Sequence, residues 1–331
     1  MPSWTWTLLL VLSTAFGFNR LIKRPRTSII RQTEERVLIL GASNGIGREI
    51  AHQYAARGAR VCVVGRRADK VMAVAEECRA RRGDGLSTDV LGIPADITSV
   101  EDMVRVRTVL DTEWAGIDTI IIAAGVSATR PLLDVAGAGL LNADVSADKI
   151  QYAVSVTEAA SRTNYLGPMI AAVSFIPLLQ RLSLSPSILL ISSLGAVIPA
   201  PTRSIYGSTK SASLLLYQAL AIEHPTIRFS FVLPSTVEGD FRASAVDQPA
   251  PTTTNTQSAH AAHGTVGTTT NLNSTSGLKV DDVARRCIHA VDHAEKVVFI
   301  PSTMKFGHLL YWIWPSFIEK KAMKKYGFVA K

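Results

Sequence analysis

A tyrosine and a lysine stand four residues apart in the segment Tyr206-Gly207-Ser208-Thr209-Lys210. Residues four apart on a helix share one face, so this spacing brings a phenol close to an ammonium group. A tyrosine with an ordinary pKa of about 10 is a poor acid or base at neutral pH. A neighbouring ammonium stabilises the phenolate and lowers the tyrosine pKa toward the working range. The pair therefore predicts proton transfer to or from a substrate oxygen.

Two more polar residues fit this chemistry. Ser193 follows an expected strand and can hydrogen-bond the substrate oxygen, while Asn164, in a long expected helix, can hold a water that passes protons to Lys210. The Y-x-x-x-K spacing alone is common on solvated helix faces. The prediction therefore depends on finding it together with a cofactor site.

A glycine-rich turn supplies that site near the start of the chain. Glycines let the backbone turn sharply and bring its N–H groups against a pyrophosphate at a helix N-terminus. No P-loop is present, since Arg48 and Glu49 replace its Lys-Ser/Thr pair. The turn reads Gly41-Ala42-Ser43-Asn44-Gly45-Ile46-Gly47 and stands between the first expected strand and the first expected helix.

The end of the second expected strand indicates which dinucleotide binds. An acidic residue there would hold the ribose 2′-OH of NAD, whereas arginine suits the 2′-phosphate of NADP. This chain has Gly65-Arg66-Arg67, so NADP(H) is favoured, although two arginines at a strand end can also be a solvated rim. Asp96, after the third expected strand, is placed either to accept from the adenine amino group or to cap a helix.

The elements that must position these residues alternate between strand and helix. Short continuous apolar strands separated by helices are typical of a parallel sheet covered on both faces, so we predict a doubly wound α/β (Rossmann) fold. The expected strands are 37–40, 60–64, 91–94, 119–123, 188–191, 229–233 and 297–300. The expected helices cover 48–57, 70–82, 100–114, 153–182 and 206–223, with a further helical stripe from Val280 to Val291.

Composition narrows the class of protein. The chain has 331 residues, of which 47% are hydrophobic and 19% charged, which excludes a chain disordered throughout. Its three cysteines, Cys62, Cys78 and Cys287, are widely spaced, so neither a disulfide scaffold nor a metal site is expected. The net charge of +8 comes largely from the two ends, which favours a membrane surface over nucleic acid as the partner.

Residues 1–22 are predicted to form a transmembrane anchor. No charged residue occurs from Pro2 to Asn19, and Trp4 and Trp6 suit an interfacial aromatic belt. A basic linker, residues 23–35, follows, which places the body of the protein on the cytosolic side. A cleaved signal peptide is the alternative, but the basic start and small-residue cleavage site that it requires are unconvincing here.

The remaining chain divides into three expected parts. Residues 36–303 form the dinucleotide-binding domain, and within it residues 248–277, rich in Thr, Ala, Asn, Ser and Gly, are interpreted as a mobile loop. Residues 304–331 combine aromatic side chains with lysines, as an interfacial helix on anionic lipid would. The same segment can equally fold onto the core of the domain.

Over residues 36–301 the chain resembles the short-chain dehydrogenase/reductase family. The resemblance implies a catalytic tetrad of Ser193, Tyr206, Lys210 and Asn164, with hydride transfer between nicotinamide and a carbonyl or alcohol carbon. It also implies that Lys210 holds the nicotinamide ribose and that Val237 contacts the carboxamide. The motifs that carry it are the glycine turn, Asp96, Ala124-Gly125, Asn164, Ile191-Ser192-Ser193, Tyr206 with Lys210, and Pro234 to Val237.

The anchor and the arginine pair are similar to the branch of that family that is attached to the endoplasmic reticulum and acts on steroids, retinoids and lipid ketones. Similar enzymes often form homodimers through their long helices. Three positions depart from the usual family pattern: Leu40, Ala123 and Ser235 replace a threonine, an asparagine and a glycine. An anchored reductase of a small soluble ketone or quinone, or a non-catalytic NADPH-binding scaffold, remain alternatives.

Overall fold

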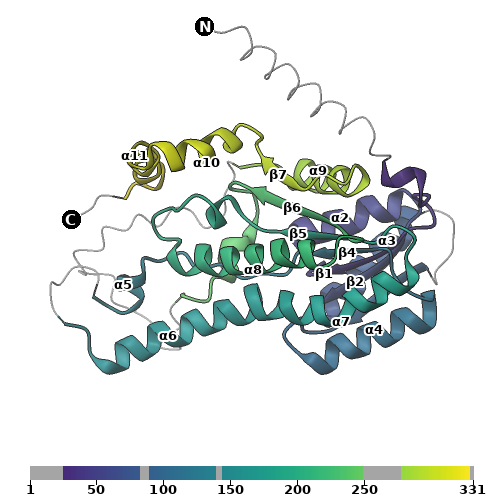
Figure 1. Ribbon diagram of the computed structural model, residues 1–331. Coiled ribbons are helices and arrows are strands. Elements are labelled where there is room, and N and C mark those ends of the chain that lie inside the picture. Colours follow the sequence, from purple (N-terminus) through teal and green to yellow (C-terminus); the bar gives the residue numbers. More distant parts are fainter. Residues whose placement is uncertain (1–24, 83–88, 139–143, 249–276, 329–331) are drawn as a thin grey trace, which may run out of the picture.

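A computed structural model of the chain describes residues 25–82, 89–138, 144–248 and 277–328. At its centre lies a sheet of seven parallel strands in the order β3-β2-β1-β4-β5-β6-β7 (Figure 1). The predicted doubly wound sheet is therefore confirmed. The strands span Arg36–Leu40 (β1), Arg60–Gly65 (β2), Val90–Pro94 (β3), Thr119–Ile122 (β4), Ser187–Ile191 (β5), Arg228–Pro234 (β6) and Val297–Ile300 (β7).

The strand order reverses at β1, which pairs with β2 on one side and with β4 on the other. The chain moves outward from β1 to β3, crosses back to β4 and continues outward to β7. In open α/β sheets, ligands bind outside the carboxyl ends of the strands at such a switch point. The ends of β1 at Leu40 and of β4 at Ile122 therefore mark where a ligand is expected.

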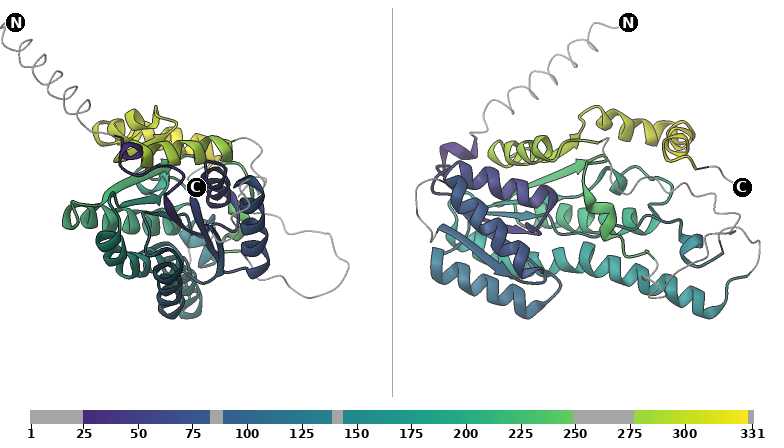
Figure 2. Two further views of the ribbon diagram at one scale, coloured as in Figure 1. Left: turned by 90° about the vertical axis from the view of Figure 1, so that its right-hand side faces the viewer. Right: turned by 180° about the vertical axis from the view of Figure 1, so that it is seen from behind.

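Helices cover both faces of this sheet (Figure 2). One face carries α2, α3 and α9, and the other carries α4, α7 and α8. The helices span Gly45–Ala56 (α2), Ala68–Arg82 (α3), Val100–Trp114 (α4), Leu132–Val135 (α5), Ala147–Ser161 (α6), Gly167–Leu182 (α7), Ser204–Glu223 (α8), Val280–Asp292 (α9), Met304–Ile313 (α10) and Pro315–Tyr326 (α11).

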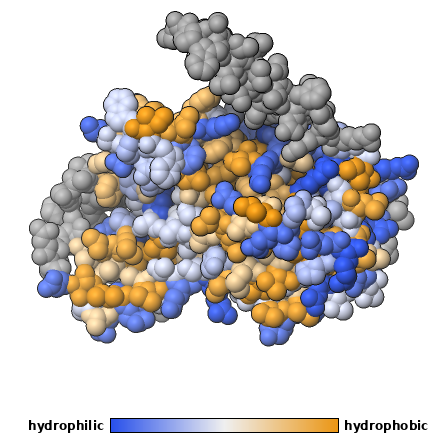
Figure 3. Space-filling view, viewed as in Figure 1, coloured by the Kyte–Doolittle hydropathy of each residue, from blue (hydrophilic) through white to orange (hydrophobic). Residues whose placement is uncertain are grey.

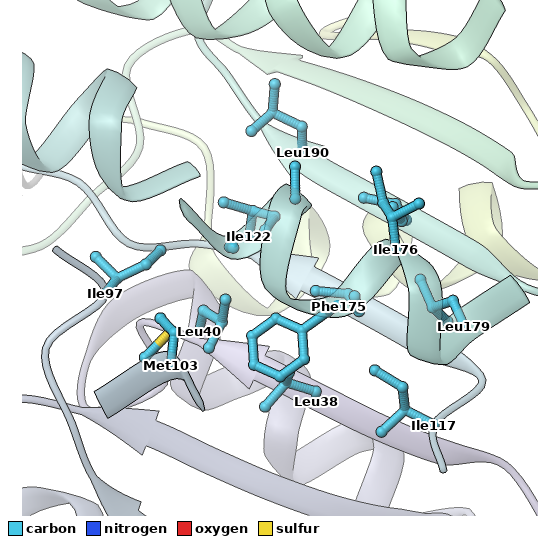
Figure 4. Packing of buried hydrophobic residues seen from close by; sticks show 14 of the residues in the cluster. Leu38, Leu40, Ile97, Met103, Ile117, Ile122, Phe175, Ile176, Leu179 and Leu190 are labelled. Carbon is cyan, nitrogen blue, oxygen red and sulfur yellow. The ribbon is translucent and has the colours of Figure 1, made fainter. Parts of the chain in front are cut away.

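Two apolar layers hold the sheet between its helices. Leu38 and Leu40 of β1 pack toward α4 and α7, in a cluster that includes Phe175 of α7 (Figure 4). The alternate residues Val37 and Ile39 pack on the other face, in the cluster that contains side chains of α2 and α9. A strand that is buried on both faces appears in the sequence as a continuous apolar run. These strands could therefore be predicted from the sequence.

The long expected helix over 153–182 is two helices, α6 and α7, joined by one turn of π-helix at Arg162–Leu166. Among the described residues, the stretch Ala147–Leu182 is long and apolar enough to cross a membrane. Half of its most apolar window is buried, and α7 packs against α4 and α8. The domain core therefore accounts for this apolarity.

The described part of the basic linker belongs to the domain instead of standing apart from it. Arg26 opens a short 3-10 helix, η1 (Arg26–Ser28), and is only 2% exposed. Its guanidinium pairs with the buried Glu35 and donates to the carbonyl oxygens of Ser185 and Asp118 at 2.8 and 3.0 Å. The boundary placed at residue 36 is therefore about ten residues too late.

Three predictions fall largely outside the described residues. These are the anchor over residues 1–22, the start of the linker and nearly all of the loop 248–277. The segments that flank the loop do meet, because Val237 and Leu278 form an isolated parallel bridge.

Candidate active site

The glycine turn lies between β1 and α2 and brings three backbone segments together. Gly41 has a φ of +94°, and a Cβ there would stand 2.4 Å from the backbone nitrogen of Ala124. A Cβ on Gly47 would stand 2.3 Å from the carbonyl oxygen of Gly41. Only glycine fits at either position, because backbone atoms cannot give way as flexible side chains do. The turn thus holds the start of α2 close to the ends of β1 and β4.

A single cavity of about 1260 Å³ extends along the carboxyl ends of the strands. It exceeds the range of about 300–1,000 Å³ that is usual for ligand pockets, so it has room for a dinucleotide beside a second molecule. Every residue predicted to bind or react lines it except Asn164. Those lining residues are Gly41, Ser43, Asn44, Gly45, Ile46, Gly47, Arg66, Arg67, Asp96, Ala124, Gly125, Ser193, Tyr206, Lys210 and Val237.

One end of the cavity carries the residues expected at the adenosine. Arg66 and Arg67 are exposed after β2, and Nη2 of Arg67 lies 3.4 Å from the hydroxyl of Ser43. The Oδ1 of Asp96 accepts from the backbone N–H of Thr98 at 2.9 Å, so this carboxylate stabilises its own turn while it faces the cavity. The helix-cap alternative for Asp96 is wrong, because Ser99 is the N-cap of α4 and accepts from the N–H of Asp102 at 3.1 Å, while the contact with adenine stays a prediction.

Tyr206, near the start of α8, lies close enough to Ser193 after β5 for the serine hydroxyl to lower the tyrosine pKa. The backbone N–H of Gly195 donates to the Ser193 hydroxyl at 3.1 Å and fixes its orientation. Burial raises the pKa of Tyr206 above its ordinary value, while the Ser193 hydroxyl and the positive charge of Arg203 act in the opposite direction. The phenol is therefore protonated at neutral pH and faces a hydroxyl partner.

Lys210 lies one helical turn after Tyr206 and is 5% exposed. Its Nζ donates to the carbonyl oxygen of Ile191 at 3.0 Å. Burial lowers the pKa of Lys210 to about 8, because a desolvated ammonium is disfavoured relative to the neutral amine. This amine therefore changes charge close to physiological pH.

Asn164 is positioned by the π-helical turn between α6 and α7. Such turns insert one extra residue into a helix and are frequent at functional sites. Its Oδ1 accepts from the N–H of Val126 at 2.9 Å, and its Nδ2 donates to the Val126 carbonyl and the Thr209 hydroxyl, both at 3.0 Å. The side chain thus joins the segment after β4 to α8. The proposed water relay to Lys210 stays a prediction.

The charge that acts on Tyr206 differs from the expected one. The sequence predicts that Lys210 lowers the tyrosine pKa, but the positive group that does so is Arg203, whose guanidinium carbon lies 5.9 Å from the centre of the tyrosine ring. Lys210 instead turns toward the carbonyl of Ile191. Arg203 precedes Tyr206 by three residues, a spacing that could have identified it.

The far wall of the cavity comes from residues that the sequence did not single out. The ring of Phe241 packs edge-on against Tyr206, with 6.0 Å between ring centres. Met304 of α10 and Ile318 of α11 also line the cavity, so the C-terminal helices contribute to the site. The sequence did not indicate this role of the C-terminal helices, because their aromatic residues and lysines also suit a membrane surface.

A family profile described as short chain dehydrogenase matches residues 35–250, which is more than half of the chain. The chain belongs to the short-chain dehydrogenase family. Membership agrees with the Rossmann-like fold and with the cavity that joins a glycine turn to Tyr206 and Lys210.

Curated relatives of this family member include plant and mammalian proteins. The 11-beta-hydroxysteroid dehydrogenase-like 2 of Arabidopsis thaliana is 32% identical over 209 residues, which cover 63% of this chain and 61% of that protein. Dehydrogenase/reductase SDR family member 7B of Bos taurus is 24% identical over 213 residues, covering 63% of this chain and 60% of that one. The match spans about three fifths of the length of these relatives.

Solved structures support the fold. An alcohol dehydrogenase from Thermococcus sibiricus, complexed with 5-hydroxy-NADP, has a TM-score of 0.59 at 21% identity, covering 80% of this chain and 94% of that one. A short-chain dehydrogenase/reductase from Burkholderia phymatum, in complex with NAD, has a TM-score of 0.66 at 16% identity, covering 88% and 97%.

The three departures from the family pattern leave the backbone of the site in place. Leu40 is buried, and its carbonyl oxygen accepts from the N–H of Ala123 at 2.8 Å, so β1 and β4 remain joined at the glycine turn. The N–H of Ser235 donates to the carbonyl of Ile300 at 2.8 Å.

All three cysteines are buried, and burial raises the pKa of each thiol. Buried thiols of this kind are poor nucleophiles, as their positions in the sequence suggested.

Proposed function

We propose that the protein is an NADP(H)-dependent reductase of hydrophobic ketones, working reversibly between a carbonyl and a secondary alcohol. The observation that carries this proposal is that Ser193 and the protonated Tyr206 line the same cavity as the glycine turn. A proton donor, an oxyanion partner and a dinucleotide cradle in one cavity are what carbonyl reduction requires.

In the proposed reaction, bound nicotinamide supplies the hydride that the carbonyl carbon accepts. Tyr206 gives its proton to the carbonyl oxygen, and the Ser193 hydroxyl hydrogen-bonds the negative charge that develops there. The positive charge of Arg203 favours the phenolate that remains, and Lys210 is proposed to hold the nicotinamide ribose. Asn164 keeps the segment after β4 and helix α8 at a fixed separation, which keeps this geometry in place.

The preference for NADP(H) follows from Arg66 and Arg67. Both side chains are exposed and line the cavity where β2 ends. No carboxylate among the described residues forms an ion pair with either of them. Planar guanidinium groups suit phosphate, so the pair is placed for a ribose 2′-phosphate.

Hydrophobic substrates fit the catalytic end of the cavity. Its apolar lining is provided by Ile198, Pro199, Phe241, Met304 and Ile318, which come from three separate parts of the chain. The names of the plant relatives point in the same direction, toward steroid-like substrates.

The experiment is NADPH oxidation by the purified full chain in neutral detergent, with matched hydrophobic and water-soluble ketones and quinones. We expect higher kcat/KM for the hydrophobic ketones and for NADPH over NADH. Replacing Arg66 and Arg67 by Ala should lower kcat/KM for NADPH by about tenfold, because a charge-assisted hydrogen bond is lost. The same substitutions should leave kcat/KM for NADH unchanged. Equal use of NADH by the unaltered enzyme, or preference for soluble ketones, would contradict the proposal.

We also propose attachment to the endoplasmic reticulum membrane, with the catalytic domain on the cytosolic side. The sequence of residues 1–22 and the exposed Phe306, Trp312 and Trp314 of the α10 region support it. η1 packs beside α9, and α9, α10 and α11 lie along the same side of the molecule (Figures 1 and 2). Failure of the full chain to float with anionic vesicles would overturn this.

A homodimer is proposed from exposed apolar side chains on the long helices. Val173 of α7 and Leu215 and Ile222 of α8 are 72%, 68% and 77% exposed. Figure 3 shows apolar surface over the helices on this face. Exposed apolar patches of this kind mark protein interfaces. Light scattering in detergent solution should give twice the mass of the chain once the mass of the bound detergent is subtracted. The Leu215→Lys variant should have the mass of the monomer.

A further inference from the structure

Basic side chains gather at the catalytic end of the cavity, away from the arginine pair assigned to the cofactor. Arg203 and Arg242 are half-buried and line the cavity together with Tyr206, and Lys321 and Lys325 of α11 line the same cavity. Among the described residues, none of these four forms a salt bridge. A substrate that enters this end therefore meets several unpaired positive charges.

The two arginines retain donors for a ligand. Arg203 uses only Nη1, which donates to the Ser127 hydroxyl and to the Ala128 carbonyl, both at 3.0 Å. Its Nε and Nη2 groups are not used in these bonds. Arg242 makes no side-chain hydrogen bond to the described part of the chain. Since a guanidinium has five N–H donors, the pair can hold a bidentate anion.

The two guanidinium groups also repel each other. Partial burial is the larger cause that lowers the pKa of Arg242, and the positive charge of Arg203 lowers it further. The carboxylates Glu238 and Asp240 line the cavity too, on the segment before Arg242, but neither is paired with an arginine of the part of the chain that the structure describes. An anion between the arginines would remove this repulsion, whereas a neutral substrate would leave it in place.

The cofactor does not account for these charges. Its phosphates are expected at the glycine turn and at Arg66 and Arg67, while Arg203 lies over the ring of Tyr206, with 5.9 Å between its guanidinium carbon and the ring centre. The apolar wall next to the basic groups suits a hydrocarbon body. A molecule with an apolar body and one anionic end matches both features.

We infer that the preferred substrate is an apolar ketone that carries an anionic group, a carboxylate or a phosphate, held by Arg203 and Arg242 with Lys321 and Lys325 at the rim. This inference rests on the proposed reductase activity and specifies its substrate class. The anionic group anchors one end of the molecule and leaves the carbonyl free to meet Tyr206.

The test compares three probes in neutral detergent with saturating NADPH: a ten-carbon methyl ketone ending in a carboxylate, its methyl ester, and the corresponding alkyl phosphate. We expect kcat/KM for the two anions to exceed that for the ester by about tenfold or more, as expected for a charge-assisted hydrogen bond. Arg242→Gln should lower this anion-to-ester ratio toward one, and Arg242→Lys should restore part of it.

Helix α11 provides a matched control. Lys321→Gln with Lys325→Gln should lower the ratio, while Lys320→Gln with Lys324→Gln, which removes the same charge from residues outside the cavity lining, should leave it unchanged. Vesicle flotation of both double variants distinguishes a lipid headgroup from a substrate anion. If the Lys321 and Lys325 variant loses only its binding to anionic vesicles, these charges serve the membrane and the inference is wrong.

The outcomes separate this inference from the proposed function. An ester reduced as well as the anions, in a Tyr206-dependent reaction, overturns the inference and leaves the reductase intact. Loss of NADPH affinity in Arg242→Gln, equal for all three probes, also overturns it, because the arginine would then hold the cofactor. If no probe and no ketone is reduced, the proposed function fails, and the inference fails with it.

Discussion

At the scale of single residues, burial shifts the pKa values of Tyr206 and Lys210 in opposite directions. Tyr206 is kept protonated by burial, and Arg203 and Ser193 oppose that effect. Lys210 is buried without a carboxylate partner in the described part of the chain and bonds a carbonyl. The lysine therefore titrates close to neutral pH, while the tyrosine does not.

This difference predicts the pH dependence of reduction. Because the pKa of Lys210 is lowered to about 8, the ammonium is present below that pH and is lost above it. Tyr206, whose pKa is raised, keeps its proton across the same range. Because the Lys210 ammonium is expected to hold the nicotinamide ribose, we expect kcat/KM for ketone reduction to be level near neutral pH and to decline above about pH 8.

Lys210→Arg provides the comparison, since a guanidinium stays charged throughout the accessible range. The activity that this variant retains should not decline above pH 8. Superimposable profiles for the two enzymes would show that another group controls the alkaline side.

The residues that react could be chosen from sequence because their spacing has a chemical meaning. The four-residue spacing of Tyr206 and Lys210 and the strand-end position of Ser193 all place them at one cavity wall. Arg203 could have been chosen by its three-residue spacing from Tyr206, but Arg242 and Phe241 were missed because their role comes from tertiary proximity. Phe241 packs on Tyr206, and Arg242 interacts with Arg203, from a segment more than thirty residues away, and nothing in a local pattern indicates these contacts.

At the scale of elements, the glycine turn is the tightest junction in the site. It is formed by β1, β4 and the first turn of α2, with backbone atoms in direct contact at Gly41 and Gly47. Strands were located accurately because they are buried apolar runs. The start of α6 and the short α5 were missed, since only Val156 and Ala160 of α6 are buried and its apolar periodicity is weak.

Gly47→Ala tests this junction. Although alanine favours helices over glycine, its Cβ would stand 2.3 Å from the Gly41 carbonyl oxygen, so α2 must shift away from the turn. We expect a loss of about 1–3 kcal/mol in the free energy of unfolding, as for overpacked cores, and weaker NADPH binding. Denaturant unfolding and fluorescence titration measure both quantities.

Gly307→Ala in α10 is the matched substitution. Its Cβ would meet only a side-chain carbon of Ile198 at 3.8 Å, an ordinary contact. We expect this variant to be as stable as the original or slightly more so. Equal destabilisation by both substitutions would mean that the close approach at Gly47 does not matter.

At the scale of the whole molecule, buried ion pairs and hydrogen bonds attach the segment after the predicted anchor to the sheet. Glu35, which is 2% exposed, is shared by Arg26 and Arg57 and accepts from the Thr119 hydroxyl at 2.6 Å. Arg57 in turn pairs with Asp292 of α9 at 2.8 Å. Sequence indicated only a run of basic residues here, because charge alone does not show which arginine is buried and paired.

This network predicts an unusual dependence of stability on residue 26. Arg26→Met leaves the carbonyls of Ser185 and Asp118 without their donor, so the free energy of unfolding should fall by about 3–5 kcal/mol. Arg31→Met is the control, since Arg31 is 82% exposed and its pair with Glu34 is 3.5 Å long. That variant should change by less than about 1 kcal/mol. Similar unfolding curves for the two variants would contradict a structural role for Arg26.

The most direct measurement of the whole account is the turnover of Tyr206→Phe with a hydrophobic ketone and NADPH, alongside its NADPH affinity. Removing the hydroxyl takes away the proton donor but leaves the cradle at the glycine turn. We predict that ketone reduction falls by at least about a hundredfold while the dissociation constant for NADPH changes little. Turnover close to that of the unaltered enzyme would show that the phenol of Tyr206 is not the acid, and the catalytic assignment would be wrong.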